Sequence, residues 1–118
     1  MLFKSKLTGI LFVIFTILHS TNINAQLDFK WASGFGDAGT DICNAIALNE
    51  NEELFFGASF SGTVDFDPGA GVVELISAGA SDIAFGKFDS SGNLLWVNRI
   101  GGTLGEGAID LSLDPSGN

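Results

Sequence analysis

The sequence begins to repeat itself at a fixed offset of 65 residues. The matched positions, each given with its partner one offset later, are Trp31 and Trp96, Gly36 and Gly101, Asp41 and Glu106, and residues 46–49 and 111–114. A fixed period of this length is typical of repeat architectures, in which each unit buries its apolar faces against the next unit. The period therefore restricts the fold to stacked units.

Alternating apolar residues predict β-strands throughout residues 42–100, and no window carries the stripe of an amphipathic helix. The residues expected to share one face of each strand are Ile42, Asn44, Ile46 and Leu48; Leu54, Phe56, Ala58 and Phe60; Ile83 and Phe85; and Leu94, Trp96 and Ile100. Small residues on the opposite faces, such as Ala45, Gly57 and Gly86, predict sheets that are covered on both sides.

Turn sequences separate the predicted strands. Residues 89–93 (DSSGN) and 114–118 (DPSGN) combine an Asp that can cap the turn backbone with a Gly that supplies positive φ, and residues 49–53 occupy a matching place. The longer connection over residues 61–82 reads as an added small hairpin. One period thus holds four strands and a hairpin, which predicts an all-β fold of propeller blades, each an antiparallel four-stranded sheet with an inserted hairpin.

Two stretches carry a family resemblance. Residues 60–69 (FSGTVDFDPG) and 81–93 (SDIAFGKFDSSGN), followed by Trp96, resemble the secreted bacterial β-propeller repeats called SBBP repeats. The resemblance covers essentially all of residues 31–118. It implies a multi-bladed propeller in an exported protein, often from bacteria of the Bacteroidetes type and often linked to a cell-surface sorting domain. The family has no established catalytic residues, so the resemblance implies architecture and location without a mechanism.

The N-terminus is predicted to be a cleaved secretory signal peptide. Lys4 and Lys6 precede an uncharged run over residues 7–18, and a polar stretch then ends at Ala25. This run is shorter than the roughly 20 apolar residues that a bilayer-spanning helix needs. We therefore expect the mature chain to begin at Gln26 and to be secreted or held at the cell surface without membrane insertion.

The expected organisation is a signal peptide over residues 1–25, a first propeller repeat over 26–95 and the start of a second, truncated repeat over 96–118. About one and a half repeats are present, whereas a closed propeller typically takes about 4 to 8 blades. We therefore expect the chain to be a fragment of a longer protein whose further blades are its partners. Residues 26–118 alone are expected to aggregate or to melt without cooperativity.

Charge and composition exclude several functions. Without the signal peptide, three basic and fourteen acidic residues give a formal charge of −11, which repels nucleic acid and anionic lipid. The only histidine, His19, leaves with the signal peptide, so a serine or cysteine nucleophile has no imidazole base and zinc has no histidine ligand. Cys43, the single thiol, has no partner for an internal disulfide and is predicted to be a small buried residue.

Three motifs suggest a ligand, and each has a plainer structural interpretation. Residues 34–39 (GFGDAG) match the dinucleotide fingerprint but precede a predicted strand where a helix is needed. Asp65 and Asp67 are calcium candidates, with Glu74 able to close the site across the hairpin, although an Asp-Pro-Gly reversal also explains them. Residues 89–93 place oxygen ligands at alternate positions but lack the glycine of a calcium loop, so they predict a hairpin turn.

The function expected from the sequence is a non-catalytic, secreted or cell-surface propeller module that binds a protein or a carbohydrate, without a cofactor. One alternative is part of an extracellular propeller hydrolase or lyase whose catalytic residues lie outside this segment. A second is a structural spacer of a larger surface protein. Four aromatic residues could stack on a ligand, but their recurrence at the repeat period favours packing between blades: Phe29, Trp31, Phe35 and Trp96.

Overall fold

The protein is built from antiparallel β-strands. The computed structural model describes residues 28–108 and 110–118, and among these it contains six strands and no helix. The strands are β1 (Ile42–Leu48), β2 (Leu54–Phe60), β3 (Thr63–Asp65), β4 (Glu74–Ile76), β5 (Asp82–Phe88) and β6 (Leu94–Ile100). The all-β prediction is confirmed, whereas the predicted signal peptide over residues 1–25 lies outside the described residues.

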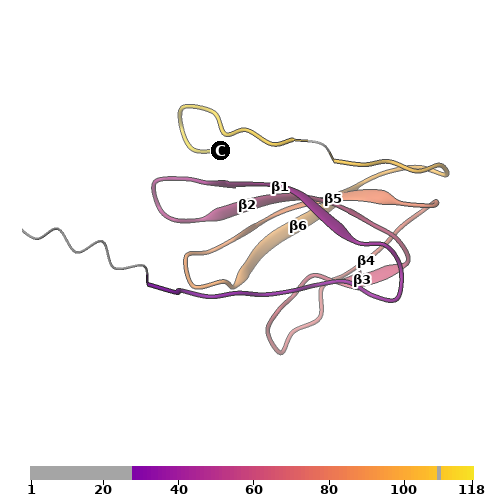
Figure 1. Ribbon diagram of the computed structural model, residues 1–118, viewed down its shortest axis with the longest axis horizontal. Coiled ribbons are helices and arrows are strands. Elements are labelled where there is room, and N and C mark those ends of the chain that lie inside the picture. The colour runs from indigo at the N-terminus through magenta and orange to yellow at the C-terminus, as the bar shows by residue number, and fades with distance from the viewer. Residues whose placement is uncertain (1–27, 109) are drawn as a thin grey trace, which may run out of the picture.

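The four long strands form one sheet in the order β1-β2-β5-β6, and β3 pairs with β4 in a separate ribbon. The ribbon is inserted between β2 and β5, where the sequence predicted a hairpin. Figure 1 shows the ribbon on one side of the sheet and the C-terminal segment, in yellow, on the other. One sheet and its ribbon therefore account for residues 42–100.

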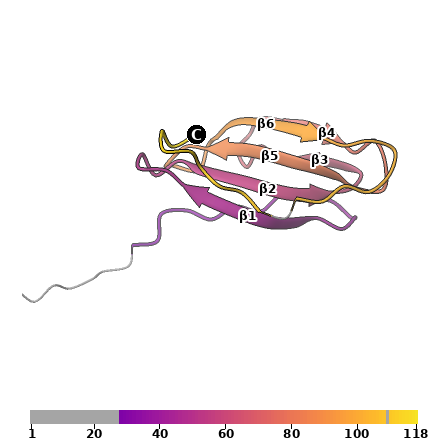
Figure 2. The same cartoon turned by 90° about the horizontal axis from the view of Figure 1, so that it is seen from above.

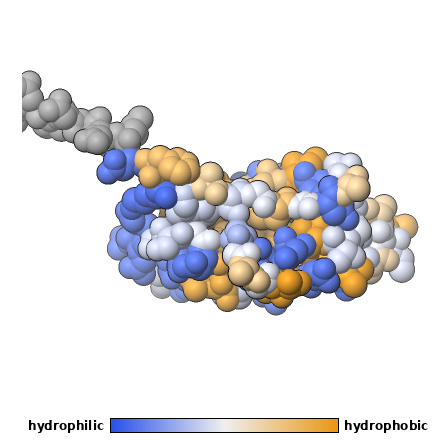
Figure 3. Space-filling view, turned by 90° about the horizontal axis from the view of Figure 1, so that it is seen from below, coloured by the Kyte–Doolittle hydropathy of each residue, from blue (hydrophilic) through white to orange (hydrophobic). Residues whose placement is uncertain are grey.

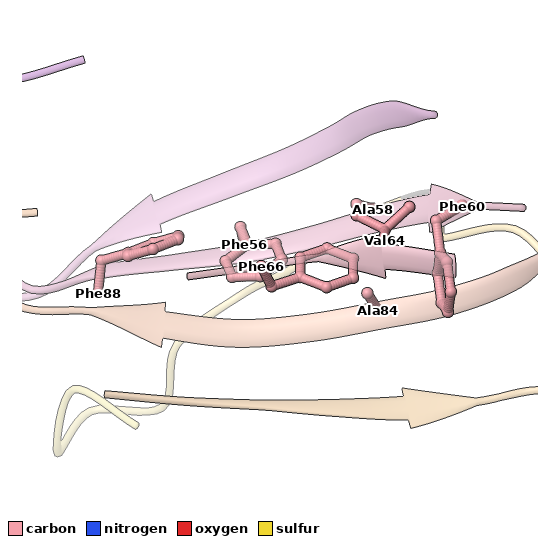
Figure 4. Packing of buried hydrophobic residues seen from close by; sticks show 7 residues of the cluster. All are labelled: Phe56, Ala58, Phe60, Val64, Phe66, Ala84 and Phe88. Atoms are coloured by element: carbon pink, nitrogen blue, oxygen red, sulfur yellow. The ribbon is translucent and has the colours of Figure 1, made fainter. Parts of the chain in front are cut away.

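The hydrophobic core lies between the ribbon and one face of the sheet, here called the core face. Its buried side chains, labelled in Figure 4, are Phe56, Ala58, Phe60, Val64, Phe66, Ala84 and Phe88. The ring of Phe66, the residue after β3, is fully buried and lies 6.1 Å from Phe56 and 5.5 Å from Phe60 between ring centroids. Because aromatic side chains bury large areas and favour offset or edge-on contacts, these rings join the ribbon firmly to the sheet.

The opposite side of the sheet, here called the groove face, is also apolar. Strand register places Lys87 opposite both Phe55 and Trp96, so these three side chains share this face. The Trp96 ring centroid lies 6.4 Å from that of Phe55 and 5.9 Å from that of Phe85. The prediction of a sheet covered on both sides therefore has a physical basis, because both faces carry aromatic residues.

Two register shifts break the alternation expected from the sequence. In β1 the shift falls between Cys43 and Ala45, so Cys43 opposes Ala58 and lies on the core face with Ile46, whereas Ile42 lies on the other face. The predicted shared face of Ile42 and Ile46 is therefore wrong. The second shift, between Lys87 and Phe88, places Leu94 and Trp96 on opposite faces of β6 although the sequence placed them together. Both shifts lie at an edge strand, where β-bulges are most common.

The prediction that Cys43 is buried is also wrong. Cys43 is exposed, and its thiol faces a shallow groove that Trp31, Phe35 and Ile46 also line. The physical reason is that β1 is an edge strand, so only one neighbouring strand covers it.

Three turns of the same design close the ends of the strands. In each, one side-chain oxygen accepts the backbone N–H groups two and four residues later, at 2.8–3.0 Å. The accepting residues are Asn49, Asp89 and Asp114. The fourth residue of each turn has positive φ: 60° at Glu52, 86° at Gly92 and 79° at Gly117. The predicted turns over residues 49–53, 89–93 and 114–118 are thus confirmed, with Glu52 standing where the others carry glycine.

Segments from outside the strands cover both faces of the sheet. On the core face, the ring centroid of Trp31 lies 5.8 Å from that of Phe88, and the ring centroid of Phe35 lies 4.8 Å from that of Phe66. On the groove face, residues 105–118 run along β2, as Figures 1 and 2 show from two directions. The sheet is therefore enclosed between an N-terminal and a C-terminal segment.

Candidate functional site

The largest hollow that aromatic residues line is on the groove face. It has a volume of about 350 Å³, and Phe55, Phe85, Lys87 and Trp96 line it from the sheet while residues 111–113 line it from the C-terminal segment. The aliphatic and aromatic lining suits an apolar occupant. Part of that space is already taken by Leu111 and Leu113, both half-buried.

A charged network borders this groove. The Nζ atom of Lys87 lies 2.6 Å from Oε2 of Glu53 and 5.0 Å from the centre of the Phe55 ring, so it makes an ion pair and a cation–π contact. The hydrogen bond from Lys87, followed by one from the Asn49 amide, lowers the pKa of Glu53. Asn49 also donates to the carbonyl of Gly117 at 3.3 Å, so the network ties the C-terminal turn to the sheet.

Hydrogen bonds recur at the sequence period around the groove. The N–H of Asp37 donates to Oδ2 of Asp41 at 2.9 Å, and 65 residues later the N–H of Gly102 donates to Oε2 of Glu106 at the same distance. The Asn49 turn likewise recurs as the Asp114 turn. The C-terminal segment therefore repeats local structure that the chain uses before and after β1.

The C-terminal segment also runs in the direction of β1. Gly107 lies near Ser59, and the Cβ of Ala108 lies 3.5 Å from the position that a Cβ on Gly57 would take. At the offset of 65, these two residues correspond to the start of β1, and Asn49 and its equivalent turn meet at the far end. Residues 107–113 thus lie alongside β2 as a further β1 would.

Sequence analysis did not find the ion pair between Asp82 and Arg99. Asp82 is fully buried, and its Oδ2 accepts from Nη1 of Arg99 at 2.6 Å and from the N–H of Ala78 at 3.0 Å. Its Oδ1 has no hydrogen-bond partner. The signal was an aspartate at an inward position of the alternating stretch that continues through Ala84 and Phe88, because a buried carboxylate needs a cation nearby.

The calcium candidates Asp65 and Asp67 brace the loop between β3 and β4. Oδ1 of Asp65 accepts the N–H groups of Val73 at 2.9 Å and Asp67 at 3.0 Å, and these bonds, Val73 first, lower the pKa of Asp65. Oδ1 of Asp67 accepts the N–H of Gly69 at 2.7 Å. Register places Glu74 opposite Asp65.

Metal binding by this loop stays a prediction. No group of three or more His, Cys, Asp or Glu side chains within residues 28–108 and 110–118 is arranged to hold a metal ion. Asp65 and Asp67 are thus the only two residues on which the calcium hypothesis rests.

The glycine-rich motif at residues 34–39 leads into β1 and so lacks the helix of a dinucleotide site, as the sequence predicted. The Asp37 carboxylate accepts from Gly39 and from Thr63, the latter at 3.3 Å, which ties this loop to the ribbon.

The remaining surface is mixed. Figure 3 shows apolar patches separated by polar side chains on the side seen from below. Of the aromatic residues expected to pack, Trp31 and Phe35 contact the core, Trp96 is 39% exposed and Phe29 is 81% exposed. In the part of the chain that the structure describes, no helix is long and apolar enough to cross a membrane.

Together these features define an all-β protein of antiparallel strands whose sheet is apolar on both faces. Comparison with protein-family models, with curated proteins and with solved structures gave no match.

Proposed function

We propose that this chain is part of an exported β-propeller of the SBBP-repeat type, in which the four-stranded sheet and its ribbon form one blade. The observation that carries this proposal is that segments one repeat away from the sheet's own edge strands cover its two faces. Residues 29–35 precede by 65 the residues of β6, and residues 107–113 follow by 65 the residues of β1. In a propeller, these segments would belong to the preceding and the following blade.

Individual contacts support this arrangement. Trp96 lies on the groove face, and its equivalent Trp31 packs on Phe88 of the core face. Ile46 lies on the core face of β1, and its equivalent Leu111 lines the groove. A groove face would therefore meet the core face of the next blade, which is head-to-tail stacking.

The propeller would act as a non-catalytic binding module at the cell surface or in the medium. Its strand-end turns would face a protein or carbohydrate partner. A polar cleft of about 320 Å³ lies between the turns that begin at Asn49 and Asp114, and Asn51, Glu50 and Ser116 contribute to its lining. Amide, carboxylate and hydroxyl groups of this kind suit the hydroxyls of a saccharide.

Imaging of the protein purified from the culture medium of its producer tests the architecture. Ring-shaped particles with radial blades would support a propeller, and filaments or featureless compact particles would contradict it. A glycan array tests the binding role. We expect retention of a polysaccharide class that the Asn51→Ala, Ser116→Ala double variant loses, with Ser90→Ala, on the turn that begins at Asp89, as the matched control.

A further inference from the structure

The core face of β1 carries apolar residues that the chain leaves uncovered. Ile46 and Leu48 are each 62% exposed. At the offset of 65, their equivalents are Leu111 and Leu113, which are half-buried in the groove beside Phe55, Phe85 and Trp96. The chain itself thus shows which surface covers these two positions.

We propose that this surface is a self-docking site, in which β1 of a second copy of the chain enters the groove face of the first. The incoming β1 takes the place of residues 107–113, which swing aside. The proposal rests on the stacking in the proposed function and goes beyond it, because the occupant is a separate molecule.

The other side of the junction is matched in the same way. On the core face of the incoming copy, residues 29–35 would yield to β6 of the first copy, so Trp96 would replace Trp31 on Phe88. Each lost contact is replaced by an equivalent one, and Ile46 and Leu48 become buried in addition. Exchange of identical elements between copies is a low-cost route to association.

The geometry of this junction is head-to-tail, so each copy offers a groove to one neighbour and a β1 edge to another. Such contacts form rings when the rotation closes and open chains when it does not. The formal charge of −11 on residues 26–118 opposes association, so added salt strengthens it by screening.

Cys43 is a natural reporter of this contact. Within one copy, Cys43 lies on the core face and Gly57 on the groove face, so the two cannot form a disulfide. In the docked pair, Cys43 of the second copy takes the place of Ala108, whose Cβ lies 3.5 Å from a Cβ placed at position 57. This separation suits a disulfide.

The test is oxidation of the Gly57→Cys variant of the signal-processed chain with copper phenanthroline, followed by non-reducing electrophoresis and peptide mapping. We expect a ladder extending beyond dimers with Cys43 linked to position 57, and more of it at higher salt. Ser90→Cys is the matched control, since its added thiol lies on an exposed turn away from the groove, and it should give no ladder of this linkage. Linkage only between identical positions, or equal ladders from both variants, would overturn the proposal.

A second variant separates this proposal from the proposed function. Cys43→Ala, Gly57→Cys, Ala108→Cys should form a disulfide within one chain, because it places thiols at the two positions already in contact. Its failure to form would count against the stacking itself. An internal disulfide in this variant, without interchain linkage in Gly57→Cys, would leave the stacking intact and refute the self-docking alone.

Discussion

Arg99 donates from Nη1 to Oδ2 of Asp82 across 2.6 Å, joining β6 to a carboxylate at the start of β5 that is fully buried. The Arg99 side chain is 35% exposed, so its charge stays partly hydrated while that of Asp82 does not. The carboxylate also lies against Gly101, where a Cβ would meet it. Two features of the sequence therefore depend on Asp82: a cation at 99 and a glycine at 101.

We expect Arg99→Met to lower the free energy of unfolding by about 3 kcal/mol, because it leaves a buried carboxylate without its cation. Solvent exposure of Arg99 keeps the loss at the low end of the range for buried pairs. Urea denaturation of the signal-processed chain measures it. The paired variant Asp82→Asn, Arg99→Met should recover part of the loss, and equal stability of Arg99→Met and the parent would contradict the role given to the pair.

Two neighbouring glycines provide a matched test of packing around Asp82. Gly101→Ala should destabilise the fold by about 1–3 kcal/mol, since the added methyl overlaps the buried carboxylate. Gly102→Ala should be tolerated, because its Cβ would come only within 3.7 Å of a Glu106 oxygen. Thermal melting of the two variants compares them directly, and an equal loss in both would argue against the close approach at Gly101.

Glu52 occupies a turn position where the equivalent residues are Gly92 and Gly117. Its φ of 60° is left-handed, a conformation that costs non-glycine residues about 1 kcal/mol or more. Glu52→Gly should therefore raise the melting temperature, even though it removes the exposed ion pair with Lys30. Glu50→Gly, in the same turn without positive φ, is the control and should not stabilise.

Acid should weaken the turn that begins at Asp89. Hydrogen bonds from the side chain and then the backbone of Asn93 lower the pKa of Asp89. The ionised group therefore favours the folded state fully above the unfolded pKa of about 3.9, and this contribution is lost as the pH falls through the lower folded value. Asp89→Asn keeps the acceptor oxygen, as Asn49 does in its own turn, and removes the titration.

Melting temperatures measured from pH 6 down to pH 2 check this expectation. The parent should lose more stability below about pH 4 than Asp89→Asn does, because only the parent protonates at this position. Parallel curves for the two proteins would show that Asp89 contributes nothing to the acid response.

The strands, the turns and the inserted hairpin could be predicted because their signals are local. Alternation fixed the positions of β2 and β5, and the Asp-Ser-Ser-Gly-Asn pattern fixed the turn between β5 and β6. The bulge near Cys43 could not be predicted, since one extra residue in an edge strand leaves no local mark and reverses the faces on either side. The partner of Asp82 depends on register between two strands, which alternation within each strand does not specify.

Calcium should have little effect on stability. Oδ1 of Asp65 and Oδ1 of Asp67 already accept loop N–H groups, which leaves each carboxylate fewer lone pairs for a cation. We expect millimolar calcium to leave the melting temperature of the oligomeric or full-length protein unchanged. A rise that Asp67→Ala abolishes would instead assign a calcium site to this loop.

The central claim is that segments one repeat away cover both faces of the sheet. An experimental structure of the exported protein tests it most directly, through what contacts Gly57 on one face and Phe88 on the other. The account predicts Ala108 against Gly57, or Cys43 of another copy in its place, together with Trp31 or Trp96 packed on Phe88. A sheet whose groove face is open to solvent, or is covered by a segment unrelated to β1 by the 65-residue offset, would contradict it.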